Sequence, residues 1–417
     1  MGFADAYLAS RCMYDRLIGE GPAKDLQVVV VVPAYDESGF EKSLDSLFHA
    51  DDIRASIEVI CVVNWPNDIH EQDKVRNKNI LEEMTGWAAD HSTIKKQFHV
   101  INIPDIPAKL AGPGYARKTG MDEAIRRFNI TGRPDGIICS FDADTTCDPD
   151  YFTSLAEKFR REPGMDACNI YFEHPVSGNE FTDDVYTGIR YYELHMRYYL
   201  QALRYAGHSN CFHTVGSAFA FRASAYCRQG GMNRRKAGED FYFLQKFFDI
   251  GKFAECNTTR VCPSPRPSGR VAFGTGPAIM EYIGTLKEPG TYHPELFLNL
   301  REFLLNLDSL NDPVHVYEHL LKGVDRPLAD FLNAAGFKDT VDEILKNSSG
   351  LTSFRKRFLR WFNMFRVLKF LNYGRTVTGD INITEAASRL LALKGIPCDK
   401  DVLSLLKVYR ELDRGII

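Results

Sequence analysis

The run Gly136-Ile-Ile-Cys-Ser-Phe-Asp-Ala-Asp144 decides the interpretation of the rest of the chain, because an apolar segment ends in two closely spaced carboxylates. The apolar part predicts a buried strand. Side chains at positions i and i+2 of extended backbone share a face, so Asp142 and Asp144 converge at the carboxyl edge of this strand. Open α/β sheets bind ligands at that edge, and such oxygen donors suit Mg²⁺ or Mn²⁺ held with a diphosphate. A strand that ends in an ordinary polar turn has the same pattern.

The composition is that of an ordinary globular protein. The 417 residues are enough for two or three domains. With 51 basic and 55 acidic residues the formal charge is -4, so no general attraction to nucleic acid is expected. The sequence has neither a secretory-signal pattern at its start nor an apolar run near the ~20 residues of a membrane span. Ten scattered cysteines without Cys-x-x-Cys pairs indicate a reducing cytoplasm. A location at the inner face of the membrane is expected if residues 354–371 contact lipid.

Segments that favour strands alternate with segments that favour helices in the first third of the chain. The predicted strands before the carboxylate run are residues 26–32, 57–63 and 98–103. The predicted helices that follow them are residues 40–48, 73–89 and 115–128. This alternation indicates a parallel, doubly wound sheet, so the predicted fold class is α/β.

Five short motifs follow one another within residues 27–260. They are Val31–Glu37 (Val-Val-Pro-Ala-Tyr-Asp-Glu), Ala116–Lys118 (Ala-Arg-Lys), Phe141–Asp144 (Phe-Asp-Ala-Asp), Thr214–Arg222 with a Gly-Ser pair, and Gly230–Asp240 with Gly-Gly at its start and Glu-Asp at its end. In this order they resemble the family 2 glycosyltransferases of the GT-A fold. The resemblance implies a Rossmann-like, mostly parallel sheet flanked by helices, with a C-terminal helical extension.

The resemblance also assigns residues to a nucleotide-sugar donor. They are Pro33, Ala34, Tyr35, Glu37, Asn64, Arg117, Lys118, Asp142 and Ala143. A tyrosine face suits stacking and a carboxylate suits ribose hydroxyls, whereas simple packing of Tyr35 and helix capping by Glu37 are the alternatives. Arg117 and Lys118 open a helix, where charge and helix dipole favour an anion; a solvated basic face is the alternative. Asn64 replaces an acid of many family members, which leaves the base open.

The same resemblance implies a metal site and a catalytic base. Asp144 is the expected direct metal ligand and Asp142 lies near the metal or the ribose, with His293 as a third ligand or a surface turn residue. Asp240 is the expected base, with Glu239 beside it. In the inverting members this carboxylate removes the acceptor hydroxyl's proton while the oxygen attacks the anomeric carbon. An acid in the first turn of a helix is the alternative.

An irregular loop rich in proline and glycine occupies residues 260–276. Related enzymes often have a lid over the donor here, so Arg266 or Arg270 is expected to contact the diphosphate or an acidic acceptor when the loop closes. The Gly216-Ser217 pair is assigned to the same acceptor and lid group. The aromatic residues within 181–207 predict a helix that packs in the core or supports an acceptor sugar.

Three domains are predicted. Residues 1–25 form a helical lead-in, residues 26–290 the GT-A domain, and residues 291–417 a helical C-terminal domain. The GT-A domain divides into a nucleotide-sugar-binding half, 26–150, and an acceptor half with base and lid, 151–290. Within the last domain, residues 354–371 are apolar on one face and otherwise basic, which predicts either a domain core or peripheral contact with an anionic membrane.

The predicted function is that of a metal-dependent, inverting glycosyltransferase of the hexosyltransferase type in polysaccharide or glycoconjugate synthesis. It would move a sugar from a nucleoside diphosphate to a hydroxyl of a glycan or lipid-linked acceptor, with Mn²⁺ or Mg²⁺. A sugar nucleotidyltransferase is an alternative, although residues 33–37 lack the glycine-rich basic loop that binds a triphosphate. A noncatalytic glycan-binding protein on the same fold is the other. The sugar, the acceptor and the oligomeric state stay open.

Overall fold

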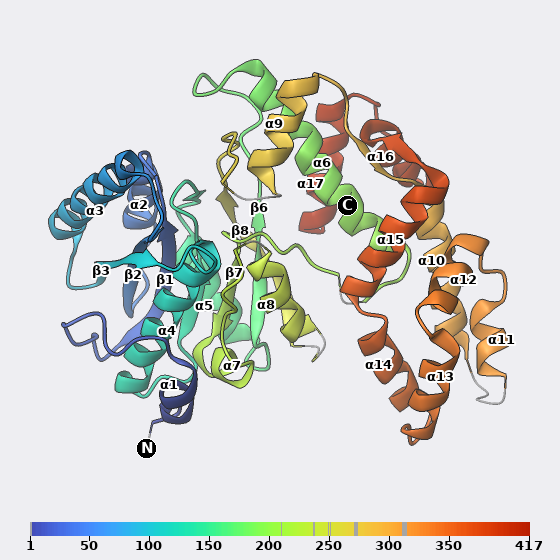
Figure 1. Ribbon diagram of the computed structural model, residues 1–417, viewed down its shortest axis with the longest axis horizontal. Helices are drawn as coiled ribbons and strands as arrows, with labels where there is room; N and C mark the ends of the chain where they lie inside the picture. Colours follow the sequence, from blue (N-terminus) through green and yellow to red (C-terminus); the bar gives the residue numbers. More distant parts are fainter. Residues whose placement is uncertain are drawn as a thin grey trace. The chain divides into compact units, whose positions relative to one another are not determined.

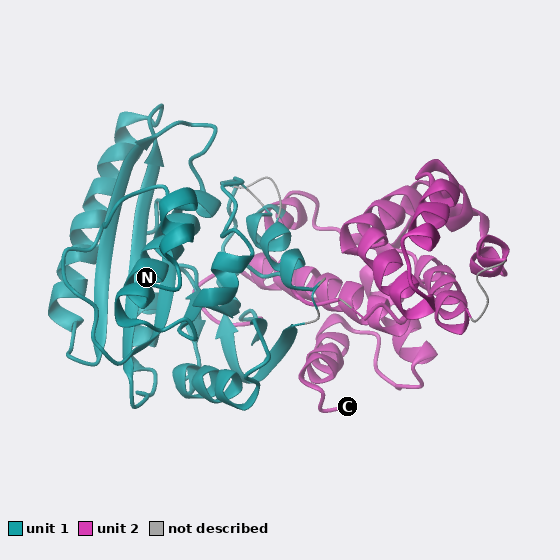
Figure 2. Cartoon of the chain, turned by 90° about the horizontal axis from the view of Figure 1, so that it is seen from below, with its two compact units in different colours: residues 1–175, 214–277 teal, residues 176–213, 278–417 magenta. Residues whose placement is uncertain are grey.

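The computed structural model describes residues 2–209, 211–236, 238–248, 250, 252–270, 274–310 and 315–417. The chain divides into two compact units, one of Met1–Pro175 with Thr214–Pro277 and one of Val176–His213 with Ala278–Ile417 (Figure 2). Residues 176–213, predicted as part of the acceptor half, group with the C-terminal helices in this division. The three predicted domain boundaries stay a prediction.

The first unit is built on an eight-stranded sheet of order β3-β2-β1-β4-β7-β6-β8-β5 (Figure 1). Its strands are β1 (Leu26–Ala34), β2 (Ser56–Pro66), β3 (Lys96–Ile106), β4 (Ile137–Ser140), β5 (Thr146–Cys147), β6 (Ala167–Phe172), β7 (Phe219–Arg222) and β8 (Phe253–Cys262). The pairs β1–β2, β2–β3, β1–β4 and β6–β8 are parallel, and β4–β7, β6–β7 and β5–β8 are antiparallel. The predicted α/β class with a mostly parallel sheet is confirmed.

Helices cover this sheet closely. They are α1 (Asp5–Arg11), α2 (Phe40–His49), α3 (Glu71–His91), α4 (Pro113–Thr131), α5 (Tyr151–Arg161), α7 (Ala223–Arg228) and α8 (Glu239–Phe248). The valines of β1 from Val28 to Val32 are fully buried, as expected of a strand covered on both faces. α4 packs on β1 and β2, and a Cβ on Gly120 would lie 2.5 Å from Val31 Cγ1, so glycine permits this close approach.

The predicted helical lead-in is mostly irregular. α1 ends at Arg11, and residues 12–25, all of them described, contain no helix. The backbone N–H groups of Leu17 and Ile18 donate to the carboxylate of Glu123 on α4 at 3.2 and 3.3 Å. Because these N–H groups bond to a side chain, the segment lies along α4 in an irregular conformation.

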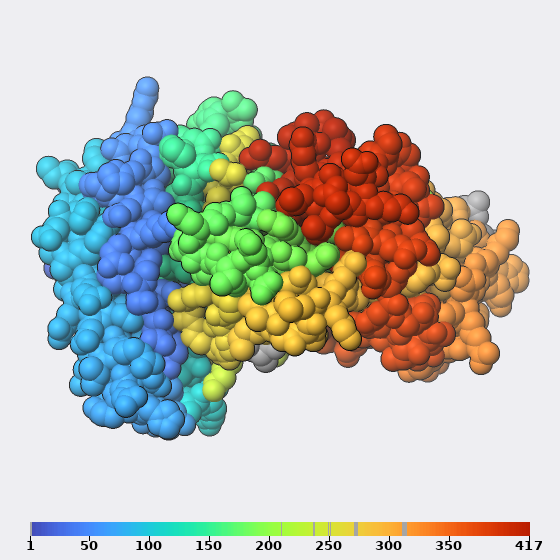
Figure 3. Space-filling model, turned by 90° about the horizontal axis from the view of Figure 1, so that it is seen from above, coloured from blue at the N-terminus to red at the C-terminus, as the bar shows by residue number. Residues whose placement is uncertain are grey.

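The second unit is helical, apart from the antiparallel ribbon of β9 (Gly290–Tyr292) and β10 (Asp380–Asn382). Its helices are α6 (Asp183–Tyr205), α9 (Thr275–Thr285), α10 (Pro294–Ser309), α11 (Val316–Leu321), α12 (Arg326–Ala334), α13 (Phe337–Lys346), α14 (Leu351–Trp361), α15 (Met364–Thr378), α16 (Ile383–Leu393) and α17 (Val402–Arg414). Figure 3 shows α6 in green beside α9 in yellow and the C-terminal helices in red. The predicted C-terminal helical region is confirmed.

A buried ion pair joins two of these helices. Arg197 of α6 is fully buried, and it donates to Glu193 at 2.8 Å and to Asp413 of α17 at 2.6 Å. Arg197 is thus enclosed by carboxylates from both helices, which satisfies its charge inside the unit.

The apolar face predicted within residues 354–371 packs inside the second unit. Phe354 and Phe358 of α14 are fully buried. The ring of Phe358 lies 5.8 Å from that of Phe303 and 6.0 Å from that of Phe337. The packing therefore favours a domain core over a free membrane-binding face. None of the described helices is both long and apolar enough to cross a membrane.

Candidate active site

The carboxyl ends of β1 and β4 bring predicted donor residues to one edge of the sheet. β1 and β4 are adjacent and parallel, with Val31 paired to Ser140, so the loops that follow them begin side by side. The loop after β1 turns at Asp36, which has a φ of 50°. The fully buried Asn77 of α3 holds this turn, because its Oδ1 accepts a hydrogen bond from Asp36 N at 2.9 Å.

Arg117 of α4 is the centre of the site, and it is only 4 % exposed. Its Nε donates to Ser140 Oγ at 3.0 Å. Its Nη1 and Nη2 form hydrogen-bonded ion pairs with Glu239 and Asp142, respectively. Because every nitrogen of the guanidinium has an acceptor, the side chain is fixed in one orientation. The acid that follows β4 and the acid that opens α8 therefore flank one buried cation.

The Gly216-Ser217 pair lies against this cation. Ser140 Oγ donates to Gly216 O at 2.7 Å. A Cβ on Gly216 would lie 2.7 Å from Arg117 Nη2 and 3.2 Å from Asp240 Oδ2. Only glycine leaves room here for both side chains. Ser217 is buried next to it.

Asp240 has a carboxyl group with a raised pKa. Burial is the main cause, the neighbouring Glu239 carboxylate adds to it, and the pKa rises to about 7 although the Arg117 cation opposes the shift. Its Oδ1 accepts a hydrogen bond from Phe241 N at 2.7 Å. Glu239 and Asp240 lie in the first turn of α8, as expected of acids that stabilise the start of a helix. This role is compatible with the predicted catalytic role of Asp240. A carboxylate with this pKa is suited to accept a proton near neutral pH.

Arg266 and Arg270 of the irregular loop form ion pairs with Glu37, the acid in the loop after β1. Arg266 Nη2 is 2.6 Å from Glu37 Oε1 and 3.5 Å from Asp144 Oδ2. Arg270 Nη1 is 3.1 Å from Glu37 Oε2 and donates to Tyr35 O at 2.5 Å. Predicted lid residues and predicted donor residues are thus in direct contact.

Asp144 lies close to two other carboxylates, those of Asp142 and Glu37. Burial is the main cause that raises its pKa to about 7, and the carboxylates of Asp142 and Glu37 add to the shift. A divalent cation would relieve the same repulsion. No group of three or more His, Cys, Asp or Glu side chains that could hold an ion occurs among the described residues. Asp144, with Asp142 close by, supplies oxygen donors of the kind that Mg²⁺ and Mn²⁺ prefer, and its role as a metal ligand stays a prediction.

The other predicted donor residues fall into two groups. Asn64 is buried and its Nδ2 donates to Gly112 O at 3.4 Å, which places its amide beside the loop that opens α4. Lys118 faces away from the site, since its Nζ lies 2.8 Å from Asp122 Oδ2 and 3.2 Å from Tyr7 OH. Consecutive residues of a helix diverge by about 100°, so only Arg117 of the basic pair joins the candidate site.

The remaining predicted residues have local roles in the structure. Ala34 and Ala143 are buried, and Pro33 is half-buried at the end of β1. His293 belongs to the second unit, where it caps α10 by accepting a hydrogen bond from Glu295 N at 3.3 Å. Its role as a third metal ligand stays a prediction. Residues 271–273 of the predicted lid lie outside the described residues.

Three residues that the motifs did not single out hold the site together. They are Asn77, Ser140 and Asn233. Asn233 Nδ2 donates to Glu239 O at 2.9 Å and its Oδ1 accepts from Arg235 N at 3.1 Å, so it fixes the approach to α8. Ser140 could have been found as the polar end of a buried strand, whereas nothing in the spacing marks Asn77 or Asn233.

Comparison with known proteins finds similarity only among solved structures. No family model matches the chain, and no curated protein matches it. Residues 1-349 of Staphylococcus aureus TarS in complex with UDP-GlcNAc align with 94 % of this chain and 92 % of that chain, at 14 % identity and a TM-score of 0.40. Mycobacterium tuberculosis glucosyl-3-phosphoglycerate synthase with Mn²⁺, UDP-glucose and phosphoglyceric acid aligns with 72 % of this chain and 81 % of that chain, at 14 % identity and a TM-score of 0.33. Similarity at this level does not identify the function, which has to be inferred from the residues of this chain.

Proposed function

We propose that this chain is a metal-dependent, inverting glycosyltransferase of the GT-A type. It moves a sugar from a nucleoside diphosphate to a hydroxyl of a glycan or lipid-linked acceptor. The observation that carries the proposal is the double ion pair of Arg117. This one buried cation joins Asp142, at the strand edge where a diphosphate would bind, to Glu239, the neighbour of a carboxyl group with a pKa near 7.

The donor binds at the ends of β1 and β4 in this proposal. Tyr35 stacks on the base and Glu37 accepts hydrogen bonds from the ribose, with Asn64 near the base. Arg266 and Arg270 transfer from Glu37 to the diphosphate when the donor arrives, since phosphate oxygens offer them stronger acceptors. Asp144, with Asp142 beside it, holds Mg²⁺ or Mn²⁺, which offsets charge on the departing diphosphate.

Asp240 acts as the base in this proposal. Its carboxylate takes the proton of the acceptor hydroxyl while that oxygen forms a bond to the anomeric carbon. The bond between that carbon and the diphosphate oxygen breaks, and its electron pair leaves on the nucleoside diphosphate. Arg117 holds Glu239 in place through their ion pair, so this acid stays beside Asp240.

The acceptor and the location follow from the same proposal. A glycan or lipid-linked acceptor would be met in the cytoplasm or at the inner face of the membrane. Because the aromatic face of α14 is buried in its own unit, contact with lipid would involve basic side chains such as Arg357 and Arg360. His293 as a further metal ligand belongs to this proposal as well.

Calorimetry combined with product analysis tests the proposal. UDP, GDP and their sugars are titrated into the protein with Mn²⁺ and again with EDTA, and the products of a panel of donors are identified. Metal-dependent binding and release of a nucleoside diphosphate are expected. Release of pyrophosphate would instead identify a nucleotidyltransferase, and glycan binding without turnover of any donor would identify a binding protein.

A further inference from the structure

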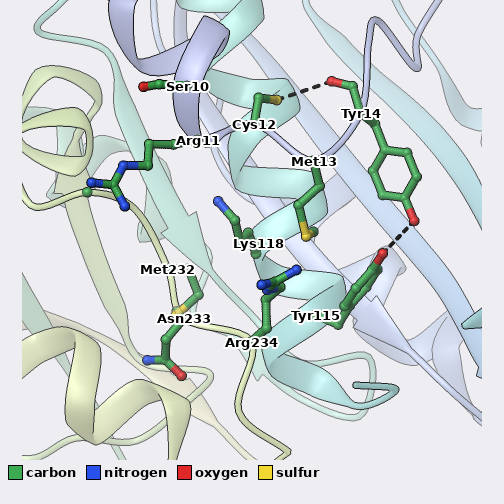
Figure 4. A pocket seen from close by; sticks show the side chains of 11 residues that line it. Ser10, Arg11, Cys12, Met13, Tyr14, Tyr115, Lys118, Met232, Asn233 and Arg234 are labelled. Carbon is green, nitrogen blue, oxygen red and sulfur yellow. Dashed lines mark hydrogen bonds between the residues drawn. The ribbon is translucent and has the colours of Figure 1, made fainter. Parts of the chain in front are cut away.

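A cavity of about 520 Å³ lies in the first unit between the end of α1 with the segment after it, the start of α4 and the segment after α7 (Figure 4). Its lining residues include three with cationic side chains, and no described residue that lines it is an Asp or Glu. The three are Arg11, Lys118 and Arg234. A concave surface with one sign of charge concentrates ligands of the opposite sign. The cavity therefore selects an anion.

Of the three cationic side chains that line this cavity, only Lys118 has an acidic partner among the described residues. Lys118 is 7 % exposed, and its Nζ lies 2.8 Å from Oδ2 of Asp122, a residue that does not line the cavity. Arg11 and Arg234 are exposed, and neither forms a hydrogen bond or ion pair with any described residue. Two guanidinium groups with free donors therefore border one cavity. A guanidinium donates two parallel hydrogen bonds to phosphate, so this pair suits a dianionic phosphate group.

The other residues that line the cavity suit the uncharged organic part of a phosphorylated ligand. Met13 and Met232 present apolar, adaptable side chains to the cavity. Tyr14 and Tyr115 stand at one side with their hydroxyl groups 2.6 Å apart, so they offer ring surface and hydroxyl oxygens together. Such a mixture of apolar and hydroxyl groups matches a sugar or polyol better than a bare ion.

We propose that this cavity binds a small phosphomonoester, such as a sugar phosphate, through Arg11, Arg234 and Lys118. The site is separate from the proposed donor site, because Lys118 and Arg117 project from different sides of α4. Binding of a phosphomonoester in this cavity does not depend on the proposed sugar transfer. The two sites share the segment before α8, since Asn233 lines the cavity and also donates to Glu239 O.

Calorimetry on the full chain tests this site with three probes: glucose 6-phosphate, inorganic phosphate and glucose. Glucose 6-phosphate is expected to bind with one-to-one stoichiometry, and to do so equally when the protein is saturated with UDP and Mn²⁺. Glucose should not bind. The variants Arg11→Gln and Arg234→Gln should each weaken binding about ten-fold or more, because each removes a charge-assisted contact to the phosphate. Arg54→Gln, at an exposed arginine that does not line the cavity, should leave binding unchanged.

Several outcomes would overturn the proposal. They are absence of binding by glucose 6-phosphate, equal binding by inorganic phosphate, displacement by UDP, and equal affinity in the arginine variants. Thermal melting of each variant without ligand shows that it is folded, which is expected because both arginines are exposed. Failure of UDP to bind while glucose 6-phosphate still binds would count against the proposed transferase and leave this site in place.

Discussion

Arg117 and Glu239 form a buried ion pair although 122 residues separate them along the chain. Each side chain is 4 % exposed, so neither can exchange its partner for water. The pair holds the start of α8 against α4 and thereby sets the position of Asp240. Stability and catalysis are therefore expected to depend on the same contact.

Replacement of Arg117 by alanine should lower the free energy of unfolding by about 3–5 kcal/mol, because it leaves two carboxylates without their shared cation. Urea unfolding of the two proteins measures the difference. Arg133→Ala is the matched control, since Arg133 pairs with the exposed Asp135 and should cost at most about 1 kcal/mol. Equal losses in the two variants would show that the Arg117 pairs contribute no more than a surface pair.

Asp240→Asn should lower the transfer rate by about 10²–10⁴-fold, because the amide cannot take the acceptor's proton. The affinity for UDP with Mn²⁺ should stay close to that of the unchanged protein. Single-turnover kinetics and calorimetry separate the two effects, and Asp135→Asn serves as a surface control. A variant that keeps its rate would remove Asp240 from the catalytic role.

The transfer rate should rise with pH through about 7, since Asp240 must lose its proton to act as a base and its pKa is raised to about 7. The same shift has the opposite effect on stability. The folded state binds this proton more tightly than the unfolded state, so its contribution to stability is lost as the pH rises from about 4 toward 7. Asp240→Asn should therefore be relatively more stable at pH 8 than at pH 5, which thermal melting at both values measures. A pH-independent difference in stability would contradict the raised pKa.

Asp144→Asn should abolish the part of UDP affinity that depends on Mn²⁺, because it removes the main carboxylate proposed to hold the ion. Titrations of UDP with Mn²⁺ and with EDTA should then agree with each other. Asp148→Asn, at a nearby acid paired with Arg260, is the control and should keep the difference between the two titrations. Retention of the Mn²⁺ effect in the Asp144 variant would place the metal elsewhere.

Arg266→Ala should weaken UDP binding about ten-fold, since the proposed contact with the diphosphate is charge-assisted. Arg270→Ala should have a similar effect, and Arg54→Ala should have none. Fluorescence or calorimetric titration of each variant provides the comparison. Unchanged affinity and rate in both loop variants would refute the lid role of these arginines.

The strands of the donor half could be predicted because apolar, β-branched runs such as Val28–Val32 have few other uses than a buried strand. The prediction that Asp142 and Asp144 lie near each other is based on extended backbone, but β4 ends at Ser140 and Asp142 O accepts a hydrogen bond from Thr145 N at 3.0 Å, so a turn after the strand carries both acids. The Asp142 carboxylate still raises the pKa of Asp144, so the two acids do influence each other. Local periodicity is therefore sufficient for the strands, but not for the conformation of the two aspartates that follow β4.

The tertiary partners could not be predicted in this way. Arg117 and Lys118 are equivalent in the sequence, and only the rotation of α4 on the sheet decides which of them faces Asp142 and which faces Asp122. The lead-in after Arg11 is irregular because it bonds to Glu123, a contact over a hundred positions away that no local pattern contains.

The space that Gly216 leaves open has a consequence for the variation of this protein between species. A methyl group at this position would meet both the guanidinium of Arg117 and the carboxylate of Asp240. Homologues that keep Arg117 and Asp240 in these positions are therefore expected to retain glycine at position 216. Homologues with a larger residue at position 216 are expected to have lost the arginine at position 117. An alignment in which positions 216 and 117 vary together would distinguish active homologues from homologues that have lost activity, without an assay.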